Sequence, residues 1–156
     1  MMAQEIERKF LVVGPYKDFA TSHYTIRQGY ICSGGGRTVR VRLCGERGFL
    51  TIKGPSLDGG LSRFEFEKEI TENEALALLF LCEPGLVEKV RWLVPNGKHT
   101  IEVDEFLGEN EGLVVAEIEL HSPDEPYLKP DFLGQEVTGE ARYYNSQLRR
   151  NPYKNW

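Results

Sequence analysis

The feature of this sequence that most constrains its fold is a repeated two-residue alternation of charged and apolar side chains. In an extended strand, residues i and i+2 point to the same face, and their neighbours point to the other. Residues 5–10, with the sequence EIERKF, therefore place Glu5, Glu7 and Lys9 on one face of a strand. Like charges at this spacing repel each other unless water or an opposite charge lies between them. One such strand is ordinary, but the pattern returns along the whole chain.

The alternation, and the turn residues that interrupt it, predict both the strands and their connections. Eight strands are expected at residues 4–13, 24–32, 37–43, 49–53, 62–70, 87–94, 99–106 and 113–121. Thr71 and Glu74 form the ends of a capping box, which predicts a helix from Glu74 to about Cys82. Residues 16–20 predict a short helix, and the segment from Thr138 to about Arg149 predicts another. We find no tandem repeat or linker, so we expect a single domain that spans residues 1–156.

Six of these strands carry a like-charged pair at positions i and i+2. The pairs are Glu5/Glu7, Arg40/Arg42, Glu65/Glu67, Lys89/Arg91, Glu102/Asp104 and Glu117/Glu119, and Lys9 and Lys53 add single bases. The opposite faces of the same strands are mostly Ile, Val, Leu, Phe and Trp. The predicted sheet is therefore charged on one side and apolar on the other.

Two arrangements satisfy such a sheet. An open sheet would turn its charged face to bulk water, whereas a closed sheet would turn it inward and cover its apolar outside with helices. Solvated faces usually intersperse both signs with neutral polar residues, and the planar fork of arginine suits phosphate oxygens. These two points favour closure. We therefore expect an α+β, mainly β fold: an eight-stranded antiparallel β-barrel, or tunnel, with a charged interior and helices packed on the outside.

Composition narrows the classes of function. The formal net charge of −5 argues against general nucleic-acid binding, and no apolar run is long enough to span a membrane. The N-terminus lacks the basic-then-apolar order of a signal peptide, so we expect a cytoplasmic protein. The scattered cysteines and histidines form no zinc or nucleophile motif. A cavity with both signs of charge suits a polyphosphate with divalent cations, because bases bind phosphoryl oxygens and carboxylates bind hard cations.

The charged strands, taken together, resemble the CYTH domain, or triphosphate tunnel metalloenzyme, superfamily. EIERK at residues 5–9 is similar to its N-terminal ExExK signature. The likeness continues in order through RQGY at 27–30, RVR at 40–42, LTIK at 50–53, RFEFE at 63–67, EKVR at 88–91, EVD at 102–104, EIE at 117–119, VT at 137–138 and RYYN at 142–145. The signature alone is weak, but the ordered set spans nearly the whole chain, and no expected charged position is replaced.

This resemblance implies a tunnel that hydrolyses or cyclises triphosphates with Mg²⁺ or Mn²⁺. By position it implies phosphate binding by Lys9, Arg40, Arg42, Lys53, Lys89 and Arg91. It implies that metal ions and water are placed by Glu5, Glu7, Glu65, Glu67, Asp104, Glu117 and Glu119. We further expect Lys9, Tyr30, Glu117 and Glu119 to be catalytic. For Tyr30, two alternatives stay open: its hydroxyl bonds Lys9 in the cavity, or its ring wedges against the barrel wall.

The leading hypothesis is hydrolysis of inorganic triphosphate to diphosphate and phosphate. The expected partner is a small-molecule triphosphate, without nucleic acid or membrane, and a homodimer is left open. A class IV-type adenylate cyclase and a thiamine or nucleoside triphosphatase are alternatives, and each would need a place for a ring. A non-catalytic polyphosphate-binding module is a further alternative. The complete set of acids argues against the module, because anion binding alone would gain from their removal.

Overall fold

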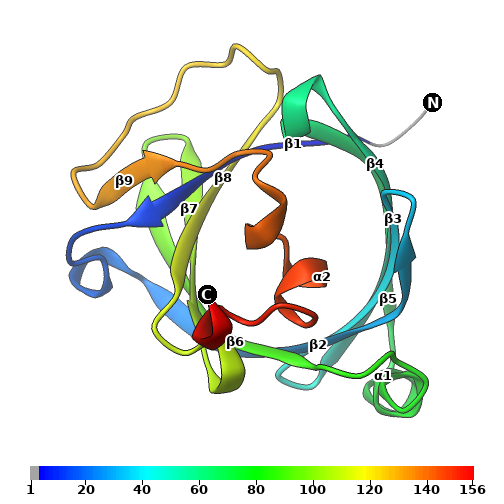
Figure 1. Cartoon of the computed structure of the whole chain (residues 1–156). Coiled ribbons are helices and arrows are strands. Elements are labelled where there is room, and N and C mark those ends of the chain that lie inside the picture. The colour runs from blue at the N-terminus through cyan, green and yellow to red at the C-terminus, as the bar shows by residue number, and fades with distance from the viewer. Residues whose placement is uncertain (1–3) are drawn as a thin grey trace.

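The computed structural model describes residues 4–156, which form a closed antiparallel barrel (Figure 1). Its strands are β1 (Gln4–Val12), β2 (Ser22–Gly34), β3 (Arg37–Cys44), β4 (Arg47–Leu57), β5 (Ser62–Ile70), β6 (Val87–Asn96), β7 (His99–Phe106), β8 (Val114–Leu120) and β9 (Leu133–Glu136). Around the barrel the order is β5-β4-β3-β2-β6-β7-β8-β1, and pairing of β1 with β5 closes the ring. The prediction of an eight-stranded antiparallel barrel is confirmed. The additional strand β9 pairs with the end of β1.

Glycines close the tight hairpins where the sequence predicted turns. Gly35 and Gly36, between β2 and β3, have φ values of 59° and 79°, and Gly97, between β6 and β7, has 64°. Residues other than glycine rarely adopt these positive φ values. Two-residue hairpin turns with positive φ values match the right-handed twist of the flanking strands. These turns fix the strand registers, because a slip of one residue would reverse every face.

The registers place opposite charges across from one another on the inner face of the barrel. Lys9 pairs with Glu117, Lys53 with Glu65, and Arg91 with Asp104 as Cα partners on neighbouring strands. Strand pairing thus supplies the counter-charges that the like-charged pairs within each strand lack. The acid pair Glu7 and Glu119 is an exception, because these two residues also face each other across β1 and β8.

The outer face of β1, β6, β7 and β8 is covered by chain segments rather than by helices. An outer apolar cluster consists of Ile6, Phe10, Tyr16, Val94, Ile101, Val103, Ala116, Ile118, Leu120, Phe132 and Leu133, all buried. Tyr16, Phe132 and Leu133 come from the segments before β2 and around β9, which therefore lie over the barrel. The predicted short helix at residues 16–20 is present as a 3₁₀ turn, Lys17–Phe19. No helix among residues 4–156 is long and apolar enough to cross a membrane.

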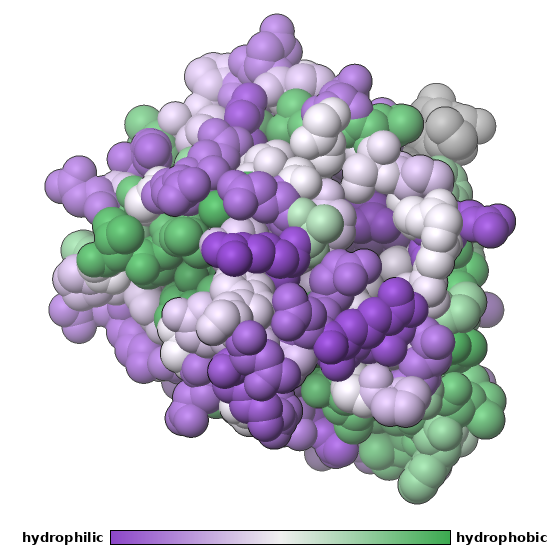
Figure 2. Space-filling model, in the orientation of Figure 1, coloured by the Kyte–Doolittle hydropathy of each residue, from purple (hydrophilic) through white to green (hydrophobic). Residues whose placement is uncertain are grey.

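Helix α1 (Glu72–Leu79) packs on the outside of β2, β3 and β4, as predicted. Thr71 and Glu74 form the expected capping box, although the helix begins and ends earlier than the sequence indicated. Gly48 allows the close approach, since an added Cβ there would lie 2.7 Å from the Cβ of Ala75. Only Ala75 of the helix is buried, and an apolar area lies over this part of the molecule, at the lower right of Figure 2.

The C-terminal segment lies across one end of the barrel and not on its outside. Figure 1 shows α2 (Asn145–Leu148) within the ring of strands. Tyr143 and Leu148 complete an inner apolar cluster with Val87, Phe106, Leu113, Val115 and Val137. Val87, Phe106 and Val115 are two residues from Lys89, Asp104 and Glu117, so they share the inner face with those charges. The barrel interior is therefore apolar at this end and charged beyond it.

The continuous helix predicted from Thr138 to about Arg149 is wrong. Only Ala141–Tyr143, a 3₁₀ turn, and the short α2 are helical, and Tyr144 between them is extended, with ψ of 135°. Gly139 has φ of 81° and packs so closely that an added Cβ would lie 2.0 Å from the carbonyl oxygen of Gly59. Contacts with the barrel end thus override the local helical pattern.

Candidate active site

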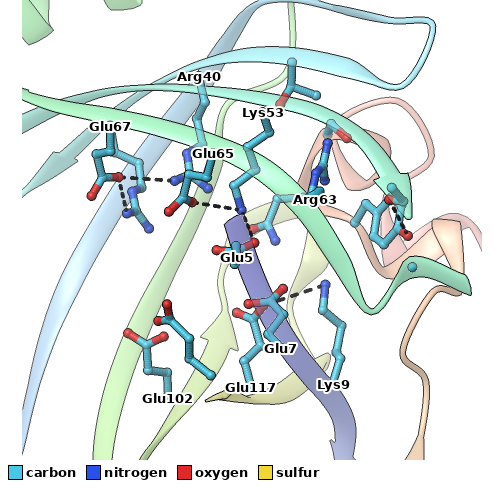
Figure 3. A pocket seen from close by; sticks show the side chains of 18 of the residues that line it. Glu5, Glu7, Lys9, Arg40, Lys53, Arg63, Glu65, Glu67, Glu102 and Glu117 are labelled. Atoms are coloured by element: carbon cyan, nitrogen blue, oxygen red, sulfur yellow. Dashed lines mark hydrogen bonds and ion pairs between the residues drawn. The ribbon is translucent and has the colours of Figure 1, made fainter. Parts of the chain in front are cut away.

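The inner charged faces enclose a cavity of about 230 Å³. Its lining contains all of the predicted site residues except Asp104: Glu5, Glu7, Lys9, Tyr30, Arg40, Arg42, Lys53, Glu65, Glu67, Lys89, Arg91, Glu117 and Glu119. Figure 3 shows acids and bases from several strands pointing toward one another across it. The predicted residues, which are far apart in the sequence, therefore meet in one place.

Arginines of β3 and β6 form a strongly cationic side of the cavity. Burial, and then the positive charges of Arg40 and Arg91, lower the pKa of Arg42. Arg40 and Arg42 share one counter-charge, Glu67, at 3.7 Å and 3.3 Å. The Nε atoms of both arginines are buried without a hydrogen-bond partner among the described residues. Crowded guanidinium groups with spare donors are suited to an anion with several oxygens.

Asp104 lies behind this side of the cavity and holds two of its bases. The Arg91 side chain donates to both Asp104 oxygens, at 2.8 Å and 2.9 Å, and the Lys89 ammonium lies 2.8 Å from Asp104. Burial would raise the pKa of Asp104, but Arg91 and Lys89 lower it. Since this carboxylate is buried and both of its oxygens are engaged, its geometry fits the positioning of bases better than the predicted binding of a metal ion.

Carboxylates of β1, β5 and β8 form the opposite, acidic side. Burial, followed by the charges of Glu117 and Glu5, raises the pKa of Glu7 well above its usual value. Burial would also raise the pKa of Glu117, but Lys9, a hydrogen bond from Glu7, and Arg91 lower it well below that value. The two pKa values move apart, which favours one proton shared between Glu7 and Glu117 and held mainly by Glu7. Such sharing of a proton is typical of two carboxylates that cannot both ionise at close range.

The remaining acids of this side are also poorly compensated. Lys53 lies 2.8 Å from Glu5 and 3.5 Å from Glu65, so one base serves two acids. Burial and then Glu5 raise the pKa of Glu65, and burial and then Glu5 and Glu102 raise the pKa of Glu119. Among the described residues, neither Glu7 nor Glu119 has an ion pair. Extra positive charge on this side would therefore be favourable.

This set of acids fits a divalent cation of the hard, oxygen-preferring type. Its ligands would be Glu5, Glu7, Glu65, Glu117 and Glu119 on adjacent strands, and the cation would relieve their mutual repulsion. Within residues 4–156, no three His, Cys, Asp or Glu side chains are grouped as a ready-made metal cage. The site therefore fits an ion that completes its shell with water and phosphate oxygens, as Mg²⁺ commonly does.

Lys9 and Tyr30 both reach the cavity, but they do not bond each other. The Lys9 ammonium lies 3.9 Å from Glu117 and 5.2 Å from the centre of the Tyr144 ring. The Tyr30 hydroxyl instead accepts a hydrogen bond of 3.0 Å from the buried amide of Gln28. The alternative in which Tyr30 bonds Lys9 is therefore wrong for this structure, while a catalytic role for Tyr30 stays a prediction.

Sequence reasoning missed several residues of the cavity lining. They are Thr38, Ser56, Gly60, Leu61, Arg63, Glu102, Tyr144, Asn145 and Ser146. The sequence pattern places Glu102 in a like-charged pair without giving it a role, and it includes Arg63 only in the likeness at residues 63–67. Tyr144, Asn145 and Ser146 belong to the misassigned C-terminal helix, and Asn145 accepts a hydrogen bond of 2.9 Å from Lys89. The likeness at residues 142–145 was the available signal for this segment.

The fold and the site together define a charged β-tunnel, in which bases that suit phosphate face acids that suit metal ions. In sequence, the CYTH domain matches residues 3–149, and the chain belongs to this family. Membership implies dependence on a divalent metal ion.

Named relatives cover almost the entire chain. An inorganic triphosphatase of Acetivibrio thermocellus is 50% identical over 157 residues, which cover 99% of each chain. An inorganic triphosphatase of Nitrosomonas europaea is 36% identical over 149 residues, covering 92% of this chain and 95% of the relative. The crystal structure of the inorganic triphosphatase NE1496 superposes with a TM-score of 0.66 at 31% identity, and the superposition covers 95% of each chain.

Proposed function

We propose that this protein is a divalent-metal-dependent hydrolase that converts inorganic triphosphate to diphosphate and phosphate. The observation that carries the proposal is the single cavity in which crowded arginines face under-compensated glutamates. A triphosphate would neutralise the first group, and metal ions would neutralise the second. The names of the relatives support the same reaction.

The polarity of the cavity favours an inorganic substrate over a nucleotide or thiamine compound. Leu61 and the rings of Tyr30 and Tyr144 are its main apolar lining, and the remaining contributors are almost all charged or polar. A base or thiazolium ring requires a larger apolar or aromatic shelf, as small-molecule sites generally provide. The C-terminal segment also covers the apolar end of the barrel, so little room for such a ring is left there.

The bases would bind the phosphoryl oxygens and stabilise charge as diphosphate departs. Phosphoryl transfer needs mainly an in-line nucleophile and stabilisation of oxygen charge, and little covalent chemistry. Arg40, Arg42 and Arg91 supply planar donors, and Lys53 and Lys89 supply point charges. Asp104 and Asn145 keep Lys89 in position.

The acidic side would prepare the attacking water. A divalent ion held by Glu5, Glu7, Glu65, Glu117 and Glu119 would supply Lewis-acid charge and lower the pKa of a bound water. Glu119, which has a raised pKa and no ion pair among the described residues, is suited to accept the proton of that water. Lys9, which is buried beside Glu117, would hold the phosphoryl group near this position.

The test is phosphate release from tripolyphosphate, ATP and thiamine triphosphate, measured side by side with Mg²⁺ and with Mn²⁺. We expect tripolyphosphate to be the preferred substrate. Arg40→Ala and Glu119→Ala should each lower its turnover by about 10²–10³-fold, as removal of one transition-state contact typically does. Circular dichroism should show both variants folded. Near-wild-type turnover in either variant, or a preference for ATP, would contradict the assignment.

Three finer points stay predictions: the preference between Mg²⁺ and Mn²⁺, a cytoplasmic location and a homodimer. The metal titration above addresses the first point. Cell fractionation addresses the second, and sedimentation equilibrium the third. The exposed apolar side chains of Phe66, Phe80 and Leu81, on β5 and next to α1, offer apolar surface that self-association would bury.

A further inference from the structure

Arg63 differs from the other bases of the cavity because, among the described residues, no carboxylate balances its charge. Lys9, Arg40, Arg42, Lys53, Lys89 and Arg91 each lie within ion-pair distance of at least one carboxylate. Arg63 lines the same cavity and has no such carboxylate among residues 4–156. Its nearest acid in the strand register is Glu5, its Cα partner, whose carboxylate is bound by Lys53 at 2.8 Å.

Backbone oxygens hold the Arg63 guanidinium in place instead. Its Nε donates to the carbonyl of Gly54 at 3.1 Å, and one terminal nitrogen donates to the carbonyl of Gly36 at 3.3 Å. Neutral carbonyls fix the orientation of the group without cancelling its charge. The other terminal nitrogen has no hydrogen-bond partner among the described residues and is not buried. A guanidinium offers five donors in a rigid fork, so donors remain for a ligand.

The surroundings of Arg63 are suited to an anion. The Arg63 Cζ lies 6.0 Å from the centre of the Tyr144 ring, which is also 5.2 Å from the Lys9 ammonium. The Tyr144 and Ser56 hydroxyls are 3.4 Å apart and both line the cavity. Figure 3 shows Arg63 and Lys53 among the side chains that line the cavity. The three groups together provide hydrogen-bond donors and a positive charge, and no carboxylate.

The position of Arg63 along the barrel distinguishes it from the central bases. In the β4–β5 register, Lys53 pairs with Glu65, and after a bulge Ser56 pairs with Arg63. Arg63 thus lies past Lys53, toward the end covered by the C-terminal segment. Gly60 packs against Gly139 of that segment, where an added Cβ would lie 2.3 Å from the Gly139 Cα. This contact fixes the loop before Arg63 and keeps Tyr144 beside it.

We propose that Arg63, with the hydroxyls of Ser56 and Tyr144, forms an outer phosphoryl subsite beyond the central bases. A linear polyphosphate longer than triphosphate would place its additional terminal phosphoryl group there. The protein would consequently bind tetraphosphate more tightly than the central bases alone allow. The proposal rests on the proposed function for the placement of the first three phosphoryl groups. Orthophosphate shares this chemistry, so the experiment must separate a chain end from a free phosphate.

The experiment measures binding of tetrapolyphosphate, tripolyphosphate and orthophosphate by calorimetry, with chelator present so that no turnover occurs. The variants are Arg63→Gln, Arg63→Lys and, as a matched control, Arg37→Gln. Arg37 is exposed at the same end of the barrel and lies outside the cavity lining. Loss of a charged hydrogen bond should weaken tetrapolyphosphate binding about tenfold to a hundredfold in Arg63→Gln. Tripolyphosphate binding should weaken by less than about threefold, and Arg63→Lys should be intermediate for tetrapolyphosphate.

Three results would overturn the subsite. Equal losses for the two polyphosphates would place Arg63 in the central site, and no loss for either would exclude it from binding. If the variant weakens only the binding of orthophosphate, Arg63 would contact the departing phosphate product and not the end of a longer chain. Thermal unfolding of each variant separates a folding defect from a binding defect. If Arg63→Gln does not fold, the tetrapolyphosphate affinity of Arg63→Lys tests the subsite instead. Because binding is measured without hydrolysis, the proposed function can fail in the turnover assay while this result stands.

Discussion

Replacing Asp104 by asparagine probes how the cavity keeps two buried bases charged without a ligand. Asp104 is 2% exposed, and its carboxylate receives two hydrogen bonds from Arg91 while lying 2.8 Å from the Lys89 ammonium. Lys89 is 1% exposed, and burial lowers its pKa to about 8 despite Asp104. The amide preserves the shape of the side chain but removes the charge that both bases face.

The expected loss of stability is large. Removing one partner of a buried ion pair typically costs about 3–5 kcal/mol, because the other charge is left uncompensated. For a chain of this size, each 1 kcal/mol shifts the melting temperature by about 2–4 °C, so Asp104→Asn should melt about 6–20 °C lower. The pKa of Asp104 is lowered in the folded state, so its stabilisation is present above the unfolded value and is lost as the pH falls. The difference from wild type should therefore shrink in acid.

The assay is urea unfolding at neutral pH, without and with tripolyphosphate. A ligand that binds only the folded state adds stability in proportion to its affinity. The polyanion supplies part of the missing counter-charge, so it should stabilise Asp104→Asn more than wild type. Glu105→Gln is the matched control: this neighbouring side chain faces outward and pairs with the half-exposed Lys17 at 3.2 Å. Such surface pairs contribute about 0–1 kcal/mol.

The reasoning fails if Asp104→Asn unfolds within about 1 kcal/mol of wild type, the range expected for a surface pair. It also fails if tripolyphosphate stabilises the variant no more than it stabilises wild type. In that case Lys89 and Arg91 would not face the ligand, whatever their effect on folding.

Two further predictions follow from the other carboxylates. Burial, Glu117 and Glu5 raise the pKa of Glu7, so the metal-free protein should lose stability as the pH rises from 4.5 through the folded pKa. Glu7→Gln should remove that decline, raise the unfolding free energy at pH 8 by about 0.5–2 kcal/mol, and impair phosphate release. Glu125 accepts hydrogen bonds from the His121 backbone and His99, which lower its pKa to about 2. Its contribution should be lost as the pH falls from 4.5 toward 2. At pH 7, Glu125→Gln should already show faster amide hydrogen exchange in residues 121–132, and unchanged exchange would contradict this role.

The strands could be predicted because their side-chain alternation is itself the physical cause of the fold. A strand with one buried face has a two-residue period, and glycine turns mark its ends. Strand β9 lacked that signal: it is four residues long, and it forms because Phe10 and Val12 of β1 offer an edge for Glu136 and Leu133. The C-terminal helix was overpredicted for a related reason. Tyr144 is extended because its side chain enters the cavity, and local propensity does not record that contact.

The faces of the charged residues were predictable, but their partners were not. Arg63 shares a face with Glu65 by alternation alone, yet its counter-charge depends on which strand closes against β5. The same holds for Asp104, which alternation places toward the cavity and closure places behind Arg91. Assigning a charged residue to metal, phosphate or a neighbouring base therefore requires cross-strand registers, which single-strand patterns do not contain.

Strand pairing compensates some of the like-charged pairs and leaves others exposed to repulsion. Lys53 lies close to Glu5, and Asp104 lies close to both Arg91 and Lys89, so each of these charges has a counter-charge within the protein. Glu7 faces Glu119 across β1 and β8, and Arg40 competes with Arg42 for Glu67. A stability-optimised sequence would substitute neutral residues at these uncompensated positions, as most stabilising changes at functional sites do. Under the proposed function, a polyanion and its metal ions would relieve the repulsion that remains, so we expect the substrate to bind at the positions where it remains.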